Sequence, residues 1–307
     1  MPDTTRRTFL AMGGAAAATS MLPFPASAKS SSALPPGLQL WTVKDELAKD
    51  FAGTLKALKT IGYARVEAAG WVNQAPAAFR AGVADAGLEC TSCHFGMRDL
   101  MTDSDADARL AAAKEVGVTY VVASSPHASR PMPGGMPWTH AVAQSMTLAD
   151  WQANAERMNI VGAKARALGL RFGYHNHSAE FLMYDGKLAW GELLRITDPA
   201  LVAFEVDIGW VAAAGVDPVE AIGLGGKRVQ LLHIKDLASK QRTPHKLIDD
   251  ETTVPIGKGT IDWKAVFAAA DRHAAIHSWF VEQEAPFVQP PLAALAESIA
   301  YLNTLRA

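Results

Sequence analysis

The chain has 307 residues, of which 49% are hydrophobic and 20% charged, a composition typical of a folded globular protein and not of a disordered or fibrous one. Its 29 basic and 31 acidic residues give a formal net charge of -2, which leaves no electrostatic basis for binding nucleic acid. Two cysteines exclude a disulfide scaffold, and the length allows one large domain or two small ones.

The first 28 residues have the pattern of an export signal. Arg6 and Arg7 precede a stretch of small and apolar residues, and Ala26-Ser27-Ala28 forms a cleavage site. The stretch is too rich in Gly, Ala, Ser and Thr for a stable membrane anchor, which needs about 20 strongly apolar residues. We therefore expect a twin-arginine signal peptide at 1–28, which the export machinery recognises, a linker at 29–36, and a folded domain at 37–307 that works in the periplasm.

Short apolar segments suited to buried parallel strands alternate with longer segments of helical periodicity along this domain. The predicted strands are 38–42, 65–68, 89–94, 120–123, 171–176, 203–207, 229–234 and 279–282. The predicted helices are 51–61, 77–86, 105–116, 148–168, 190–196, 218–224, 263–272 and 286–307. We expect the gap at 124–147 to be a loop at the active site.

Alternation of this kind over about 250 residues predicts an α/β fold of the (β/α)8, or TIM barrel, type. A doubly wound sheet is the alternative. No glycine-rich phosphate loop follows the first predicted strand, which makes the doubly wound alternative less favourable.

Polar residues occupy the ends of the last four predicted strands, where a TIM barrel carries its functional side chains. They are His175 and His177, Glu205 and Asp207, His233 and Lys235, and Glu282 and Glu284. The members of each pair share a face because side chains alternate along a strand. Imidazoles and carboxylates together suit a divalent ion such as Mn²⁺, Mg²⁺, Co²⁺ or Zn²⁺. The pattern predicts a metal site at this rim, although each residue taken alone is explained equally well as a hydrogen-bonding group or a member of an ion pair.

Several short motifs of the domain occur together in one known family. They are Gly173-Tyr-His-Asn-His177 with Glu180-Phe181, Asp207-Ile-Gly-Trp210, His233-Ile-Lys-Asp236, Gly257-Lys-Gly-Thr-Ile-Asp-Trp263, Val281-Glu-Gln-Glu284, and, in the first half, Gln39-Leu-Trp-Thr42 and Gly62-Tyr63 with Glu67. Together they resemble the sugar phosphate isomerase/epimerase family, which shares the xylose isomerase-like TIM barrel and binds one divalent metal ion through two Glu, an Asp and a His. The resemblance implies as metal ligands Glu180, Asp207, His233 and Glu282.

One position departs from the family pattern. Many epimerases place their first ligand, a Glu, inside the fifth strand, where this chain has His175. The first ligand is therefore either Glu180 or a histidine of the segment 175–177.

The resemblance also implies a reaction, in which a carbon-bound proton is removed next to a metal-bound carbonyl of a sugar. Glu180 and Glu282 would then exchange this proton. His177, His94 and Lys235 are further candidates for the assisting acid or base, because histidine titrates near neutrality and a buried lysine can have a lowered pKa.

Four other residues are expected to contact the substrate: His94, His175, Trp41 and Trp210. The tryptophans would form apolar walls for a face of the sugar, although core packing explains them equally well. His94 is explained equally well as a hydrogen-bonded rim residue.

Two other functions use the same site. A lyase or dehydratase acting on 3-keto-glycosides or inososes is expected if a hydroxyl or glycosidic oxygen lies β to the carbonyl. A periplasmic carbohydrate-binding barrel without activity is expected if Glu282 or His233 points away from the rim. Export favours an unphosphorylated sugar or keto-sugar in each case, and the sequence leaves the oligomeric state open.

Overall fold

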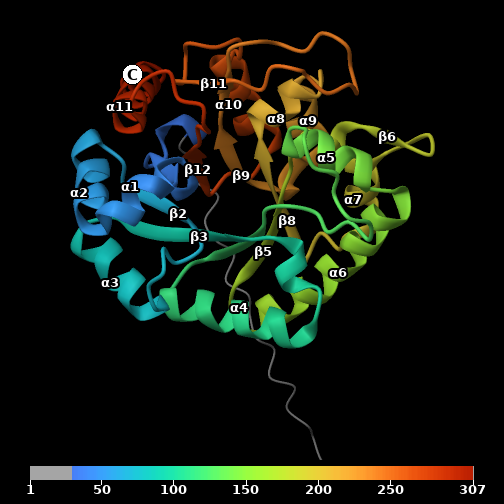
Figure 1. Ribbon diagram of the computed structural model, residues 1–307, viewed down its shortest axis with the longest axis horizontal. Coiled ribbons are helices and arrows are strands. Elements are labelled where there is room, and N and C mark those ends of the chain that lie inside the picture. Colours follow the sequence, from blue (N-terminus) through green and yellow to red (C-terminus); the bar gives the residue numbers. More distant parts are fainter. Residues whose placement is uncertain (1–29, 307) are drawn as a thin grey trace, which may run out of the picture.

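The computed structural model describes residues 30–306, which form a closed barrel of parallel strands surrounded by helices (Figure 1). Around the barrel the order is β1-β2-β3-β4-β5-β8-β9-β12, and β12 pairs with β1 to close it. The barrel strands are β1 (Gly37–Gln39), β2 (Arg65–Ala69), β3 (Glu89–Phe95), β4 (Tyr120–Ala123), β5 (Arg171–His175), β8 (Val202–Asp207), β9 (Val229–Ile234) and β12 (Ser278–Val281). The predicted TIM barrel is confirmed.

The outer layer consists of helices that follow the strands along the chain. They are α2 (Phe51–Ile61), α3 (Pro76–Asp85), α4 (Asp103–Val116), α6 (Leu148–Ala167), α7 (Ala189–Ile196), α9 (Pro218–Gly225), α10 (Trp263–His273) and α11 (Pro291–Thr304). Several begin directly after an Asp or Thr whose side chain accepts a hydrogen bond from a backbone N–H of the first turn, as at Asp50, Thr102, Thr147, Asp217 and Asp262. Such caps satisfy N–H groups that the start of a helix leaves without partners.

Shorter elements lie in the connections between barrel strands. They are the helices α1 (Lys44–Lys49), α5 (Trp138–Ser145) and α8 (Ile208–Ala213), and the ribbons β6–β7 (Met183–Tyr184 and Lys187–Leu188) and β10–β11 (Asp236–Leu237 and Thr253–Val254). The segment 124–147, expected to be a loop, therefore contains α5. Strand β1 is shorter than predicted, because a 3-10 helix begins at Leu40 and the Gln39 side chain accepts a hydrogen bond from the Trp41 backbone N–H.

The predicted signal peptide at 1–28 lies outside the described residues, and nothing in the structure bears on it. Part of the expected linker packs against the barrel: Ser31–Ala33 forms a 3-10 helix, and the Trp279 indole N–H donates a hydrogen bond to the Ser31 carbonyl oxygen. Within residues 30–306, no helix combines the length and the apolar character that crossing a membrane requires.

The barrel interior has an apolar layer beneath a polar one. The apolar layer is the cluster Tyr120, Val122, Ala203, Leu231 and Phe280. Two residues further along their strands stand Glu205, His233 and Glu282. Because side chains alternate along a strand, these polar residues also face the interior, one layer closer to the carboxyl ends of the strands.

The connection after β9 is folded around the carboxylate of Asp236. Asp236 Oδ2 accepts hydrogen bonds from the backbone N–H of Gly257 and Gly259 and from the Trp263 indole N–H, at 2.9, 3.2 and 3.0 Å. A Cβ atom on Gly259 would lie 2.1 Å from Asp236 Oδ1, and Gly257 has a φ of 85°. Only glycine fits both conditions at these positions, which explains the Gly257–Trp263 motif as a structural one.

The Asp236→Asn variant is expected to lose about 3 kcal/mol of unfolding free energy, because an amide NH2 cannot accept the hydrogen bonds that Oδ2 now accepts and buried donors are left unpaired. Chemical denaturation measures this loss. The matched control is Asp217→Asn, since Asp217 caps α9 through a single hydrogen bond to the Val219 N–H and asparagine caps equally well. A loss below about 1 kcal/mol for Asp236→Asn would contradict the role assigned to this carboxylate.

Candidate metal centre and active site

A cavity of about 840 Å³ opens at the carboxyl ends of the barrel strands. The residues at its wall come from the ends of many strands and from the connections that follow them. Of the side chains predicted from the sequence, it is lined by Trp41, His94, His175, His177, Trp210 and Glu282. Asp207, His233 and Lys235 are fully buried directly beside these residues.

One group of side chains in the polar layer has the arrangement of a metal site. One ligand atom each from His175, Asp207, His233 and Glu282 lies within 4.8 Å of the others. His233 Nδ1 is 2.9 Å from Glu282 Oε2 and 3.7 Å from Asp207 Oδ2. Ligands of a Zn²⁺ ion stand about 2.0–2.2 Å from it, so they lie roughly 3–3.5 Å from one another. The two distances from His233 Nδ1 lie on either side of this spacing, and all four ligand atoms lie within 4.8 Å of one another.

The charges in this group also fit a cation. Asp207 Oδ2 is buried and accepts no hydrogen bond from any residue of 30–306, although Lys235 Nζ lies 3.2 Å away. The pKa of Asp207 is raised to about 6. Burial is the largest cause and the carboxylate of Glu282 adds to it, and together they outweigh Lys235 and His233, which lower this pKa. Two buried carboxylates that share one region are stabilised by a divalent cation between them. The residues present therefore fit a divalent metal ion.

Lys235 does not have the lowered pKa that a general base requires. Burial alone would lower its pKa, but the carboxylates of Asp207, Glu282 and Glu284 outweigh burial and raise it above the ordinary lysine value. Its Nζ atom lies 2.6 Å from Glu284 Oε1 and 3.0 Å from Glu282 Oε2, and 4.2 Å above the Trp210 ring. The expectation of a lowered pKa is wrong, because the strand ends surround this ammonium with carboxylates; Lys235 is a fixed cation in the site.

The two histidines at the end of β5 are neutral. Burial, together with neighbouring cationic groups, lowers the pKa of both His175 and His177 well below the ordinary imidazole value. His177 lines the cavity, and its Nδ1 atom forms no hydrogen bond with any described residue. The rings of Trp138 and Trp210 lie 4.5 and 5.8 Å from its ring centre. A neutral imidazole held in this way has the chemistry of a general base.

Glu180 is placed away from the ligands. It is fully buried in the turn after β5, where the Tyr174 hydroxyl donates a hydrogen bond to Oε1 at 2.6 Å and the His177 backbone N–H donates one to Oε2 at 3.0 Å. It belongs to neither group of potential ligands that the described residues form, and it does not line the cavity. The candidate for the first ligand is therefore His175.

Glu180 gives a test of its own. Burial raises its pKa to about 7, more than its hydrogen bonds from Tyr174 and His177 lower it. In the unfolded chain this carboxyl ionises near pH 4.5. Between pH 4.5 and pH 7 the folded protein therefore keeps a proton on Glu180 that the unfolded chain has lost. The free energy of unfolding falls as the pH rises from about 5 to about 7. In Glu180→Gln the side chain is neutral at every pH: its oxygen still accepts the hydrogen bond from the His177 backbone N–H, and the contact with Tyr174 reverses, the NH2 donating to the hydroxyl oxygen.

We expect the stability of Glu180→Gln, relative to the wild type, to rise by up to about 3 kcal/mol between pH 5 and pH 8. Denaturant unfolding of both proteins at four pH values measures the difference, from which other titrating groups cancel. A difference that does not change with pH would show that Glu180 is ionised in the folded protein.

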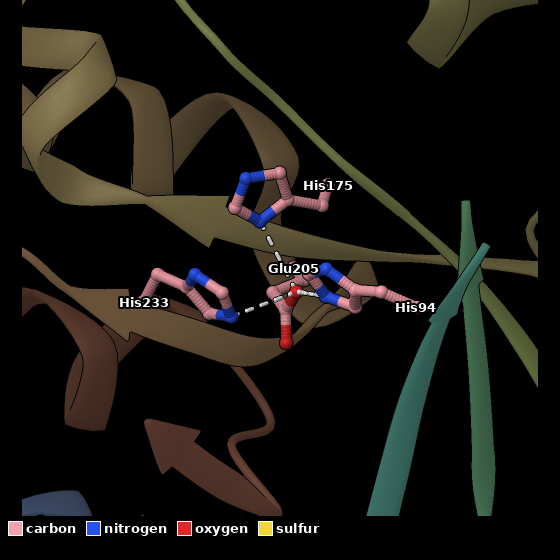
Figure 2. A group of neighbouring side chains, drawn as sticks. All are labelled: His94, His175, Glu205 and His233. Atoms are coloured by element: carbon pink, nitrogen blue, oxygen red, sulfur yellow. Dashed lines mark hydrogen bonds and ion pairs between the residues drawn. The ribbon is translucent and has the colours of Figure 1, made fainter. Parts of the chain in front are cut away.

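Two buried carboxylates of the site were not assigned a role from the sequence, Glu67 and Glu205. Figure 2 shows the Glu205 carboxylate among the rings of His94, His175 and His233. Each carboxylate stands at a shift in strand register, between Val66 and Glu67 in β2 and between Phe204 and Glu205 in β8. Alternation along the strands places Glu205 on the same face as Asp207, which was the available signal, but the register shifts leave no trace in the sequence.

His94 lies between these carboxylates, with Nε2 at 2.7 Å from Glu205 Oε2 and 2.9 Å from Glu67 Oε2. Burial lowers its pKa, but Glu67 and Glu205 outweigh burial and raise it to about 9. His94 is therefore a cation near neutral pH, able to donate hydrogen bonds and not to accept a proton.

Aromatic rings form much of the cavity wall. Trp210, Trp41 and Trp138 all line the cavity; Trp210 is otherwise buried, whereas Trp41 and Trp138 remain 46% and 40% exposed. Trp71 also lines the cavity and packs edge-on against Phe95. Trp138 was missed from the sequence because it lies on α5, inside the segment expected to be a loop.

The comparisons with known proteins agree with this fold. A family model described as xylose isomerase-like TIM barrel matches residues 55–305. An inosose dehydratase of Geobacillus kaustophilus is 25% identical over 237 residues, which cover 70% of this chain and 73% of that protein. Alignments with two inosose dehydratases of Clostridium perfringens are shorter and span 54% of those proteins.

Solved structures are similar over most of the chain. A crystal structure of a sugar phosphate isomerase/epimerase from Parabacteroides distasonis has a TM-score of 0.69 and 24% identity, and the match covers 90% of this chain and 94% of that one. The structure of the IolI protein with a bound zinc atom has a TM-score of 0.64 and 14% identity, covering 89% of this chain and 98% of that one. At these identities the structures show a shared fold.

Proposed function

We propose that this chain, which belongs to the xylose isomerase-like TIM barrel family, is a divalent-metal-dependent enzyme that isomerises or epimerises an unphosphorylated sugar or keto-sugar. The observation that carries the proposal is the group His175, Asp207, His233 and Glu282, which reaches the cavity wall beside the neutral ring of His177. The IolI protein, which shares the fold, binds a zinc atom, and this supports a divalent metal in the present chain.

A divalent ion bound by the four ligands would withdraw electron density from the oxygens of a hydroxy-ketone and so acidify the neighbouring C–H bond. His177 is the residue that accepts this proton, because it is neutral and lines the cavity. Glu282 also lines the cavity; burial raises its pKa, but Lys235 and His233 outweigh burial and hold it well below its usual range, so this carboxylate is the second candidate for accepting the proton. Lys235 holds Glu282 and Glu284 in place through its ammonium group.

Elimination is the second candidate reaction, and the similarity to inosose dehydratases favours it. Elimination begins with the same removal of a proton next to a carbonyl, followed by loss of an oxygen attached one carbon further along. The same residues therefore serve an isomerase and a lyase, and the substrate decides between the two. A carbohydrate-binding barrel without activity is less favourable, since Glu282 and His233 both face the site.

The charges at the cavity wall support an unphosphorylated substrate. Among the described residues that line it, Arg109 is the sole Lys or Arg, and its guanidinium lies 3.8 Å from Asp99. Glu251 and Glu284 add further carboxylates to the wall. A phosphate group would meet net negative charge here. A periplasmic location, inferred from residues 1–28 alone, would supply the same kind of substrate.

Metal analysis and proton exchange test the proposal. The purified protein is analysed for bound metal, reconstituted, and incubated in D₂O with a panel of free and 3-keto sugars while NMR follows loss of C–H signals. We expect deuterium incorporation at the carbon next to the carbonyl, with either an epimer or an elimination product. Absence of bound metal, or absence of both exchange and elimination across the panel, would overturn the proposed function.

A further inference from the structure

Three imidazole nitrogens converge on a single carboxylate oxygen in the barrel (Figure 2). Glu205 Oε2 lies 2.7 Å from His94 Nε2, 3.1 Å from His175 Nδ1 and 3.2 Å from His233 Nε2. The first two contacts are hydrogen bonds. The third is a charge contact, because His233 Nε2 makes its hydrogen bond with Glu67 Oε2 at 2.6 Å. The four residues could also be regarded as the ligands of a second ion. The oxygen, however, stands at the meeting point of the nitrogens, which is the arrangement of one acceptor with several N–H donors.

Glu67 faces two of the same nitrogens, His233 Nε2 and His94 Nε2. Its Oε2 atom accepts a hydrogen bond from the Gln39 side-chain amide at 2.9 Å and lies 2.6 Å from His233 Nε2. Glu67 and Glu205 are both fully buried, and each stands at a register shift of its strand. Such irregularities re-aim side chains next to active sites. The extra residue at each shift, Thr91 in β3 and Gln230 in β9, lies in the strand that carries His94 or His233, so the irregularity re-aims these histidines toward the two anions.

These contacts determine which ring nitrogen each histidine can offer to a metal. A nitrogen that carries a proton and donates it to a carboxylate has no lone pair for an ion. His175 donates through Nδ1, which leaves Nε2. His233 donates through Nε2, which leaves Nδ1, the atom that faces Glu282 and Asp207.

From this geometry we infer that Glu205 is a positioning residue and not a ligand: it holds His175 and, together with Glu67, His233 in the tautomers that bind one ion with Asp207 and Glu282. The inference rests on the proposed function. A histidine that binds a metal through one ring nitrogen has an N–H on the other. A carboxylate that accepts a hydrogen bond from this N–H fixes the orientation of the ring and raises the basicity of the nitrogen that binds the metal. His175 and His233 belong to both groups of potential ligands. If a second ion were bound in the group with His94 and Glu205, each of these two histidines would have to bind an ion through both ring nitrogens and so lose both ring protons.

Metal titration of wild type and Glu205→Gln tests the inference. The amide offers one acceptor oxygen and turns an NH2 group toward the imidazole N–H donors. We expect one ion per chain in both proteins, with the Kd for Zn²⁺ raised about 10- to 100-fold in the variant, and Glu205→Asp between the two. Glu192→Gln is the matched control: it makes the same change at a buried glutamate of α7 that pairs with Arg195, and its Kd should equal that of the wild type.

The outcomes separate the alternatives. Two ions in the wild type and one, equally tight, in Glu205→Gln would make Glu205 a ligand and overturn the inference, as would one ion with an unchanged Kd in the variant. No ion in the wild type would overturn the proposed function and the inference with it. If Glu205→Gln does not fold, ¹⁵N–¹H correlation of the zinc-loaded wild type decides the question, since it must show protons on His175 Nδ1 and His233 Nε2.

Discussion

Replacing His233 by alanine is expected to abolish binding of a divalent ion at physiological concentrations. The Nδ1 atom of His233 lies closest to the two carboxylates of the ligand group, at 2.9 Å from Glu282 Oε2 and 3.7 Å from Asp207 Oδ2. Its loss removes one of the four proposed ligands. We expect the Kd for Zn²⁺ to rise more than about 100-fold, beyond the cost of losing an outer partner of a ligand.

Calorimetric titration of the metal-free protein measures this effect, and far-ultraviolet circular dichroism shows whether the barrel is intact. Two further variants locate the first ligand. His175→Ala should weaken Zn²⁺ binding by a similar factor, whereas Glu180→Gln should leave the Kd unchanged, because both oxygens of Glu180 already accept hydrogen bonds from Tyr174 and His177. The reverse pattern would return the ligand role to Glu180.

The success of the sequence in predicting the barrel has a physical reason. Strands of a parallel barrel are covered on both sides, so they appear as short apolar segments that are easily separated from the helices. The turn after β5 is different. Glu180 follows the strand by five residues, and its direction depends on the Tyr174 hydroxyl, a contact made only once the turn has formed. No periodicity in the sequence reports such a contact.

Glu67 and Glu205, the carboxylates that contact the histidines, show a second limit of what can be predicted from the sequence. Alternation along β8, β9 and β12 is enough to place Asp207, His233 and Glu282 on the inner face, since a period of two is fixed by the strand itself. The contacts of Glu67 and Glu205 with His94 and His233 form beside register shifts, whose extra residues are Thr91 in β3 and Gln230 in β9. Register between strands far apart in the sequence is set by packing of the whole barrel, and the residues at the shift carry no local signature of it.

His177→Ala is expected to separate chemistry from metal binding. The ring of His177 lines the cavity, is neutral because burial lowers its pKa, and is fixed between Trp138 and Trp210. A general base contributes about 10² to 10⁴ in rate. We expect proton exchange with the most reactive sugar of the panel to fall by a factor in this range, while the Kd for Zn²⁺ stays within about threefold of the wild-type value, since His177 lies in neither group of potential ligands that the described residues form.

His177→Gln sharpens this test, because glutamine keeps much of the volume and the hydrogen-bonding capacity of histidine but has no basic nitrogen. Exchange as slow as in His177→Ala supports proton transfer by the imidazole, and wild-type exchange in the glutamine variant would leave His177 only a role in positioning the sugar. His273→Ala, in the last turn of α10, is the control for loss of a histidine outside the cavity. If instead Glu282→Gln stopped exchange with the metal still bound and His177→Ala did not, Glu282 would be the residue that removes the proton, and the imidazole would form only part of the wall.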